Sequence, residues 1–269
     1  MSQTQTKIGP LGIYKELNRS NCGDCGVKTC FAFASLVFQS QKKISECPHL
    51  GADKTNQLVG EIEKKMSLEE ELMASLVRLE TKVSEIDLDK AASNLGGLIR
   101  EEKLVIKCLG KNFHIDKHGH VSSEIHIHSW IKGPLLNYII RNTEVNPSGK
   151  WIAFKELPSG QRWHPLYRQR CEKVLLKLAD ENTSLFSDVA GLFGKRMEIA
   201  GITADRITIH YPLPKLPVLI CYTGWENGFD SNLTLYYDEN AEEIVNIESI
   251  YSLAVGMTIM IEKIMRRHG

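Results

Sequence analysis

The chain has 269 residues, of which 42% are hydrophobic and 25% are charged, and its 33 Lys and Arg residues balance 33 Asp and Glu residues. This composition is typical of an ordinary globular protein that forms one large domain or two smaller ones. The formal net charge of zero argues against a protein that holds nucleic acid or an anionic membrane mainly through basic side chains.

The first ten residues, MSQTQTKIGP, contain no apolar core, so a signal peptide is not expected. No apolar stretch approaches the roughly 20 residues that a membrane-spanning helix needs. We therefore predict a cytoplasmic protein. In that compartment cysteines stay reduced, and they are interpreted as buried thiols, reactive groups or metal ligands.

Four of the seven cysteines lie close together in the sequence, with the spacing C-x2-C-x4-C-x16-C: Cys22, Cys25, Cys30 and Cys47. Four clustered cysteines in a reducing compartment predict a metal site. A structural zinc site usually combines two short-spaced pairs. Three ligands on one tight loop with a distant fourth instead favour an iron–sulfur cluster. Zinc and a cluster of free thiols remain the alternatives.

The loop around these cysteines is glycine-rich and polar. Gly23 and Gly26 each follow a predicted ligand, and glycine lets the backbone curl so that its N–H groups point at sulfur. The polar residues predict that the loop lies at the surface. Cys30 opens an apolar run that is predicted to be a helix. Four apolar residues are expected to bury the opposite side of this helix: Phe31, Phe33, Val37 and Phe38.

The pattern N-C-G-x-C-G-x-x-x-C, followed by an apolar helix and by C-P, resembles the cluster-binding module of the corrinoid iron–sulfur protein's large subunit. A similar module occurs in the B subunit of the Rnf electron-transport complex. The resemblance covers about residues 10–50 and implies one [4Fe-4S] cluster on Cys22, Cys25, Cys30 and Cys47. The family usually has a proline shortly before the Asn-Cys pair, where this chain has the segment 17–20.

The rest of the chain predicts a mixture of helices and short strands without a regular βαβ alternation, which favours an α+β fold. Helices are predicted over residues 52–92, 126–142, 163–180, 184–195 and 247–267. Strands are predicted over residues 103–109, 112–116, 120–122, 151–154, 207–211, 217–222 and 234–237, with a proline-rich turn at 212–214. We expect a small helical cluster-binding module at 1–51, a helical connector at 52–86 and a larger mixed α+β domain at 87–269.

Two stretches of this larger domain, 151–160 and 213–230, resemble a domain family of unknown function that often follows the same cluster module in anaerobic microbes. The match covers about residues 87–265. It implies the α+β fold and no activity, so no catalytic residue is assigned. Asp205 and Asp230, near predicted strand ends, are candidate site residues. The separate cysteines Cys108, Cys171 and Cys221 are expected to be buried thiols.

Histidines cluster in one part of this domain: His114, His118, His120, His126 and His128. A second metal site is conceivable there, but surface histidines and a pair at a helix start are the preferred interpretation. Asp116 and His118 match the start of the cobalamin-binding pattern Asp-x-His-x-x-Gly, but the required glycine is replaced by Val121. A corrinoid is therefore possible but unsupported by a motif.

The leading functional hypothesis is electron transfer from the cluster to a redox partner protein or a bound cofactor. Four cysteine ligands leave no iron open to substrate, which favours electron transfer over Lewis-acid catalysis. The resemblance adds corrinoid-linked anaerobic metabolism as the context. One alternative is a redox enzyme whose active site lies in the C-terminal domain, with the cluster as its internal electron donor. Another is a purely structural cluster in an interaction module.

Overall fold

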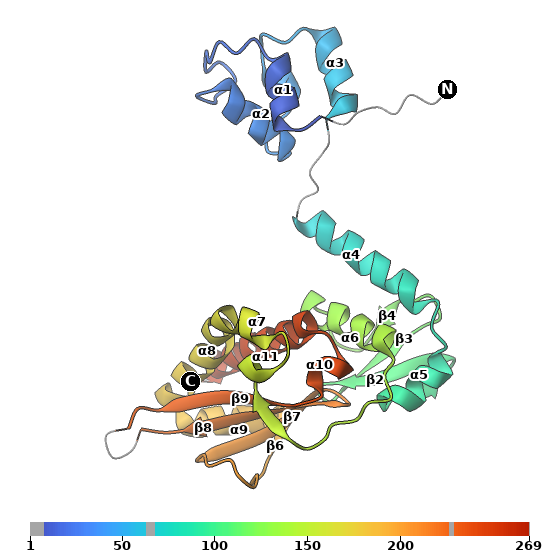
Figure 1. Ribbon diagram of the computed structural model, residues 1–269, viewed down its shortest axis with the longest axis vertical. Helices are drawn as coiled ribbons and strands as arrows, with labels where there is room; N and C mark the ends of the chain where they lie inside the picture. Colours follow the sequence, from blue (N-terminus) through green and yellow to red (C-terminus); the bar gives the residue numbers. More distant parts are fainter. Residues whose placement is uncertain (1–7, 63–67, 226–228, 269) are drawn as a thin grey trace. The chain divides into compact units, whose positions relative to one another are not determined.

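The computed structural model describes residues 8–62, 68–225 and 229–268. It divides into two compact units, Met1–Ser75 and Leu76–Gly269, which are labelled unit 1 and unit 2 below (Figure 1). Helix α4 (Leu68–Val83) crosses the boundary between them. Each unit is described by itself.

Unit 1 is helical. Its elements are α1 (Pro10–Glu16), α2 (Cys30–Phe38), the short 3-10 helix η1 (Ile44–Glu46) and α3 (Ala52–Glu61). The core consists of apolar side chains from all four elements, with Ile13, Phe33 and Leu58 at most 2% exposed. A bridge between Ile8 and Ile62 joins the first described residues to the end of α3.

The helix predicted after the third cysteine is confirmed as α2, but its apolar face differs from expectation at one position. Phe33 and Val37 are buried, and Phe38 packs against the same cluster. Phe31 is 50% exposed and only meets the edge of Tyr14, with the ring centroids 5.5 Å apart. The prediction that Phe31 is buried was wrong, because Phe31 and Phe33 differ by about 200° around a helix and cannot share one face.

In unit 2 the C-terminal half of α4 is followed by α5 (Leu88–Leu95) and by a four-stranded antiparallel sheet in the order β1-β2-β3-β4. Its strands are β1 (Leu98–Arg100), β2 (Lys103–Cys108), β3 (Lys111–Ile115) and β4 (Val121–Ser122). Burial alternates along the end of β3, where Phe113 and Ile115 are buried and His114 between them is partly exposed. Strands β2 and β3 lie within one residue of their predicted bounds, and the end of β3 shows the alternation expected of a strand with one buried face.

A second, five-stranded antiparallel sheet has the order β5-β9-β8-β7-β6. Its strands are β5 (Trp151–Ala153), β6 (Gly194–Arg196), β7 (Arg206–Leu213), β8 (Leu216–Thr223) and β9 (Asn232–Asp238). The central strand β8 is buried along almost its whole length. The two antiparallel sheets and their surrounding helices confirm the α+β fold.

The remaining helices complete the core of unit 2 (Figure 1). They are α6 (Ser129–Arg141), η2 (Phe154–Glu156), α7 (Gly160–Tyr167), the π-helical turn η3 (Arg168–Glu172), α8 (Lys173–Glu181), α9 (Thr183–Phe193), α10 (Ala241–Ile244) and α11 (Ile247–His268). Helices α8 and α9 lie against the five-stranded sheet, and α6 lies against α11. Tyr167 and Tyr237 are fully buried in the resulting core, and their hydroxyl oxygens lie 2.8 Å apart. Tyr167 also stacks on Phe154 with a centroid distance of 3.7 Å.

Several local predictions differ from the structure. Strands β1 and β6 were missed, since each has only three residues and carries no alternating pattern. Residues 194 and 195, predicted to end a helix, instead begin β6, and the helix predicted over 52–92 is interrupted at residues 84–87. Residues 212 and 213 were assigned to a turn, but β7 continues through Leu213. The register of β7 on β8 shifts between His210 and Leu213, and this irregularity lets Pro212 lie in a strand without donating a ladder hydrogen bond.

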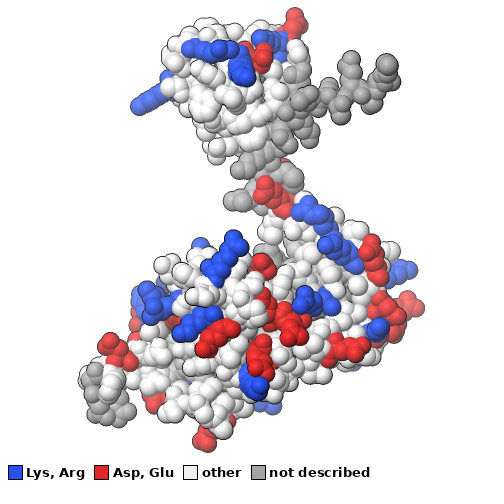
Figure 2. Space-filling model, viewed as in Figure 1, with Lys and Arg blue, Asp and Glu red and all other residues white. Residues whose placement is uncertain are grey.

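Basic and acidic side chains are interspersed on the visible face of unit 2, as expected from a balanced composition (Figure 2). Among the described residues, no helix combines the length and the apolar character that crossing a membrane requires.

Candidate metal centre

The loop that precedes α2 is closed by two side chains. Thr29 caps the helix, and its hydroxyl accepts a hydrogen bond from the backbone N–H of Ala32 at 3.1 Å. The side-chain oxygen of Asn21 accepts one from the backbone N–H of Cys30 at 2.8 Å. This second bond joins the start of the cysteine loop to its end, so that residues 21–30 form one closed turn at the N-terminus of α2.

Both glycines of the loop adopt conformations that other residues rarely take. Gly23 has φ of 81° and Gly26 has φ of 78°, and the N–H of Gly26 donates to the carbonyl of Gly23 at 2.8 Å. A Cβ atom at Gly23 would contact nothing within 4 Å. The need for glycine at this position is therefore conformational and not steric.

The segment that carries the fourth cysteine lies against this loop. Lys42 donates to the backbone carbonyl of Cys25 at 3.2 Å, and the same ammonium group pairs with Glu46 at 2.6 Å. The Nε2 atom of His49 lies 2.8 Å from Oδ2 of Asp24. Contacts on both sides of Cys47 thus reach the segment between the first two cysteines, 17 to 25 residues earlier in the chain.

The four cysteines differ in exposure. Cys30 and Cys47 are each 7% exposed and belong to the apolar cluster of unit 1, against which the half-buried Cys25 also packs. Cys22 is exposed. All four are free thiols. The structure therefore gathers three thiols at one apolar cluster, with the fourth on the solvent side of the same loop.

On the exposed side of the loop, the largest influence on the pKa of Asp24 comes from His49, a residue that the sequence analysis missed. Hydrogen bonds from His49, and then from the Cys22 thiol, lower the pKa of Asp24 below its usual range. One ligand atom each of Cys22, Asp24 and His49 lies within 4.8 Å of the other two. His49 stands two residues after Cys47, and this proximity to a predicted ligand was the only sequence signal for it.

Thiolates are the usual protein ligands of iron–sulfur clusters and are also common ligands of zinc. Four thiols in one small unit, three of them on a loop whose conformation depends on two glycines, have the donor chemistry of such a centre. An exposed set of one thiol, one carboxylate and one imidazole also suits a single zinc ion. The donor types alone fit both kinds of metal.

The other three cysteines are buried in unit 2, as predicted, and are 1%, 0% and 5% exposed at Cys108, Cys171 and Cys221. Burial raises the pKa of each of these thiols to about 12. They are therefore protonated near neutral pH, as is typical of buried thiols that serve in packing.

The histidines of unit 2 have structural surroundings. Asp116 accepts hydrogen bonds from the backbone N–H groups of His118 and His120, which closes the turn between β3 and β4. His126 and His128 lie before α6 in a segment without strand structure, with ring centroids 4.6 Å apart. Within the described residues, no three potential ligand atoms converge in this region.

Comparison with known families assigns most of unit 2. A family model described as "Domain of unknown function (DUF3786)" matches residues 87–260, which is more than half of the chain. The chain belongs to the DUF3786 family. In this member of the family, a second model described as "Putative Fe-S cluster" matches residues 17–49, the segment that contains all four clustered cysteines.

Curated relatives match a part of this DUF3786 protein. The gamma 1 subunit of the acetyl-CoA decarbonylase/synthase complex of Methanosarcina thermophila is 38% identical over 88 residues, or 33% of this chain and 17% of the relative. The gamma subunit of Methanocaldococcus jannaschii is 40% identical over 48 residues, or 18% of this chain and 10% of the relative.

The large subunit of the corrinoid/iron-sulfur protein of Moorella thermoacetica is 42% identical over 40 residues, or 15% of this chain and 9% of the relative. The DUF3786 protein thus spans less than a fifth of the length of each of these relatives. No solved structure matches it.

Proposed function

We propose that this protein binds one [4Fe-4S] cluster through Cys22, Cys25, Cys30 and Cys47 and transfers electrons to a partner in corrinoid-linked anaerobic metabolism. The iron–sulfur family model over residues 17–49 supports the cofactor class. The names of the relatives, which include a corrinoid/iron-sulfur protein, support the metabolic context.

The observation that carries this proposal is the convergence of the cysteine loop and the segment around Cys47. Lys42 and His49 both contact the segment between Cys22 and Cys25, which supports a common site for all four thiols. When bound, an iron–sulfur cluster supplies reversible one-electron transfer. Four thiolates would occupy one coordination position on each iron, which favours electron transfer over substrate binding at the metal.

The chain's own residues would hold the centre on one side and leave it accessible on the other. Cys30 and Cys47 lie in the apolar cluster, which excludes water from their side of the site. The exposed Cys22 and its exposed neighbours Asp24 and Lys28 are proposed to form the opposite side. An electron donor must come close to its acceptor, and we infer that a partner approaches this side, where the charges of Asp24 and Lys28 orient it.

The partner is proposed to be another protein. The relatives are named as subunits of a complex or as the large subunit of a corrinoid/iron-sulfur protein. Their similarity covers at most 33% of this chain, so the proposal takes from them only the cluster and its redox role. We propose that unit 2, which has the DUF3786 match, contributes the specificity for the partner.

Purification of the full chain without oxygen, followed by iron and sulfide analysis, tests the cofactor. We expect equal amounts of iron and sulfide, corresponding to one cluster per chain. Electron paramagnetic resonance after dithionite should show a signal that is absent before reduction. A protein that contains zinc, with neither iron nor sulfide, would overturn the proposal. A cluster that dithionite cannot reduce would favour the structural role.

Alanine variants test the ligands. Replacement of Cys22, Cys25, Cys30 or Cys47 should abolish or convert the cluster, because each thiolate is proposed to hold one iron. The matched controls are Cys108→Ala, Cys171→Ala and Cys221→Ala, whose thiols are buried in unit 2 and should not affect iron content. Full iron content in a variant of the first group would remove that residue from the ligand set.

A further inference from the structure

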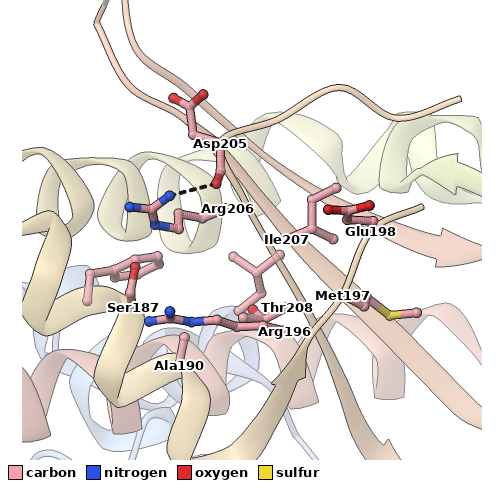
Figure 3. A pocket seen from close by; sticks show the side chains of 11 residues that line it. Ser187, Ala190, Arg196, Met197, Glu198, Asp205, Arg206, Ile207 and Thr208 are labelled. Atoms are coloured by element: carbon pink, nitrogen blue, oxygen red, sulfur yellow. Dashed lines mark hydrogen bonds between the residues drawn. The ribbon is translucent and has the colours of Figure 1, made fainter. Parts of the chain in front are cut away.

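Unit 2 contains a pocket of about 370 Å³ between α9 and the second sheet (Figure 3). This volume lies within the range of small-molecule sites. The pocket is apolar along Phe186, Ala190 and Ile220, and it carries polar groups from Ser187 and from two arginines, Arg196 and Arg206. The family match assigns no function to any of these residues.

Strand register brings the two arginines to the same face of the sheet. Arg196 on β6 pairs with Thr208 on β7, which in turn pairs with Ile220 on β8. Cross-strand partners point to the same side of a sheet, and so do residues two apart on one strand. Arg206, two residues before Thr208, therefore shares this face. Phe186 and Ser187 of α9 line the pocket over it.

Ser187 is the most informative residue of the pocket. It is only 5% exposed, and its hydroxyl has no hydrogen-bond partner among the described residues. Buried hydroxyl groups almost always have such a partner. Ser187 is one of the residues that line the pocket, so a rotation of its side chain would present the unpaired hydroxyl to a bound ligand.

The charged groups are arranged to favour an anion. One Nη atom of Arg206 is held by the backbone carbonyl of Asp205 at 2.9 Å, which leaves its other N–H groups for a ligand. The carboxylate of Asp205 accepts from the N–H of Gly224 and points away from both guanidinium groups (Figure 3). Glu198 lies on the far side of the pocket from Ser187 in this view.

Arg196 has only a loose partner, because the closest oxygen of Asp188 is 3.6 Å away and both side chains are exposed. It also lines a neighbouring hollow of about 640 Å³ on β6. That hollow contains Lys107 and Lys195 and, among its described lining residues, no acidic side chain. The surroundings of Arg196 therefore add positive potential, which attracts anions to this edge of the sheet.

We propose that this pocket binds a small ligand that has an oxyanion, either a carboxylate or a phosphate ester, attached to an apolar group. The guanidinium groups of Arg196 and Arg206 bind the oxyanion oxygens, since planar guanidinium groups form paired hydrogen bonds with such anions. Ser187 donates a third hydrogen bond. The apolar group packs on Phe186 and Ala190.

Calorimetric titration of the full chain with phenyl phosphate, benzoate and inorganic phosphate tests this proposal. Binding of phenyl phosphate or of benzoate supports it, and the tighter of the two identifies the anion type. Inorganic phosphate should bind more weakly than phenyl phosphate because it has no apolar group. Arg196→Gln and Arg206→Gln should each weaken binding by about tenfold, as expected for the loss of charge-assisted hydrogen bonds.

Two further variants separate binding from folding. Ser187→Ala should weaken binding but leave the melting temperature unchanged or higher, because it removes a buried hydroxyl without a partner. Arg162→Gln, an exposed arginine on α7, is the control and should bind like the wild type. The proposal is overturned if none of the three probes binds, or if the Arg196 and Arg206 variants bind as well as the control.

Discussion

The imidazole of His49 lies 2.8 Å from the carboxylate of Asp24, and this contact joins the loop between the first two clustered cysteines to the segment that follows the fourth. The two residues are 25 positions apart in the sequence. Both side chains are about half exposed, so the pair adds little to the stability of the fold. Its importance is positional, because it lies beside Cys22 on the accessible side of the proposed centre.

Charge reversal on this side should slow electron transfer to a partner. We expect Asp24→Lys and Lys28→Glu to lower the transfer rate in a salt-dependent way while the cluster is retained, because surface charges orient the encounter. Stopped-flow oxidation of the reduced protein at low and high salt measures this effect. Asp53→Lys, on the exposed surface of α3, is the control. Equal electron-transfer rates in all variants would show that the partner docks at another surface of the protein.

Unit 2 should fold without the cysteine module. Removal of residues 1–67 retains α4, whose Leu76 and Val83 are buried and whose Glu80 pairs with Lys132 at 2.7 Å. We expect a cooperative thermal transition by circular dichroism, since a unit with its own core can fold alone. Removal of residues 1–87 deletes these contacts and should lower the melting temperature. An aggregated product from the first truncation would contradict the independence of unit 2.

Stability should fall in mild acid because of His210. This residue is 1% exposed, and its Nε2 atom lies 2.9 Å from the hydroxyl of Thr208. Burial lowers the pKa of His210 from 6.5 to about 4. Between pH 4 and pH 6.5, the His210 side chain binds a proton in the unfolded chain but not in the folded chain. This residue's contribution to the free energy of unfolding therefore decreases by about 3 kcal/mol from pH 6.5 to pH 4.

Urea unfolding at several pH values checks this prediction. His210→Gln should show a smaller loss of stability across the same pH range, since the variant has no proton to bind at this position. His118→Gln, which replaces an exposed imidazole, is the control and should retain the wild-type pH dependence. An unchanged slope in the His210 variant would assign the acid sensitivity to other groups.

Gly256 on α11 is predicted to be essential for packing against α6. A Cβ atom at this position would collide with the indole ring of Trp130. Gly256→Ala should therefore lower the free energy of unfolding by about 1–3 kcal/mol, as overpacking typically does. Gly191→Ala on α9 is a matched control, because no atom lies within 4 Å of its Cβ position. The control should be neutral or stabilising by up to about 1 kcal/mol, since alanine favours helix.

Local patterns were sufficient for much of this protein. The sequence alone indicated a metal site from the spacing of four cysteines. It also predicted helices α2 and α11, because apolar periodicity lies within short stretches of sequence. The buried state of Cys108, Cys171 and Cys221 was also predictable from their apolar or mixed surroundings. The ligand assignment itself stays a prediction.

Contacts between distant residues could only come from the tertiary structure. Strand β6 has no pattern of its own and exists because Gly194, Lys195 and Arg196 pair with β7. That pairing brings Arg196 to the face that α9 covers, where Ser187 has an unused hydroxyl. His49 likewise meets Asp24 only after the chain has turned back on itself. Such contacts depend on strand register and on the packing of whole elements, which no short stretch of sequence encodes.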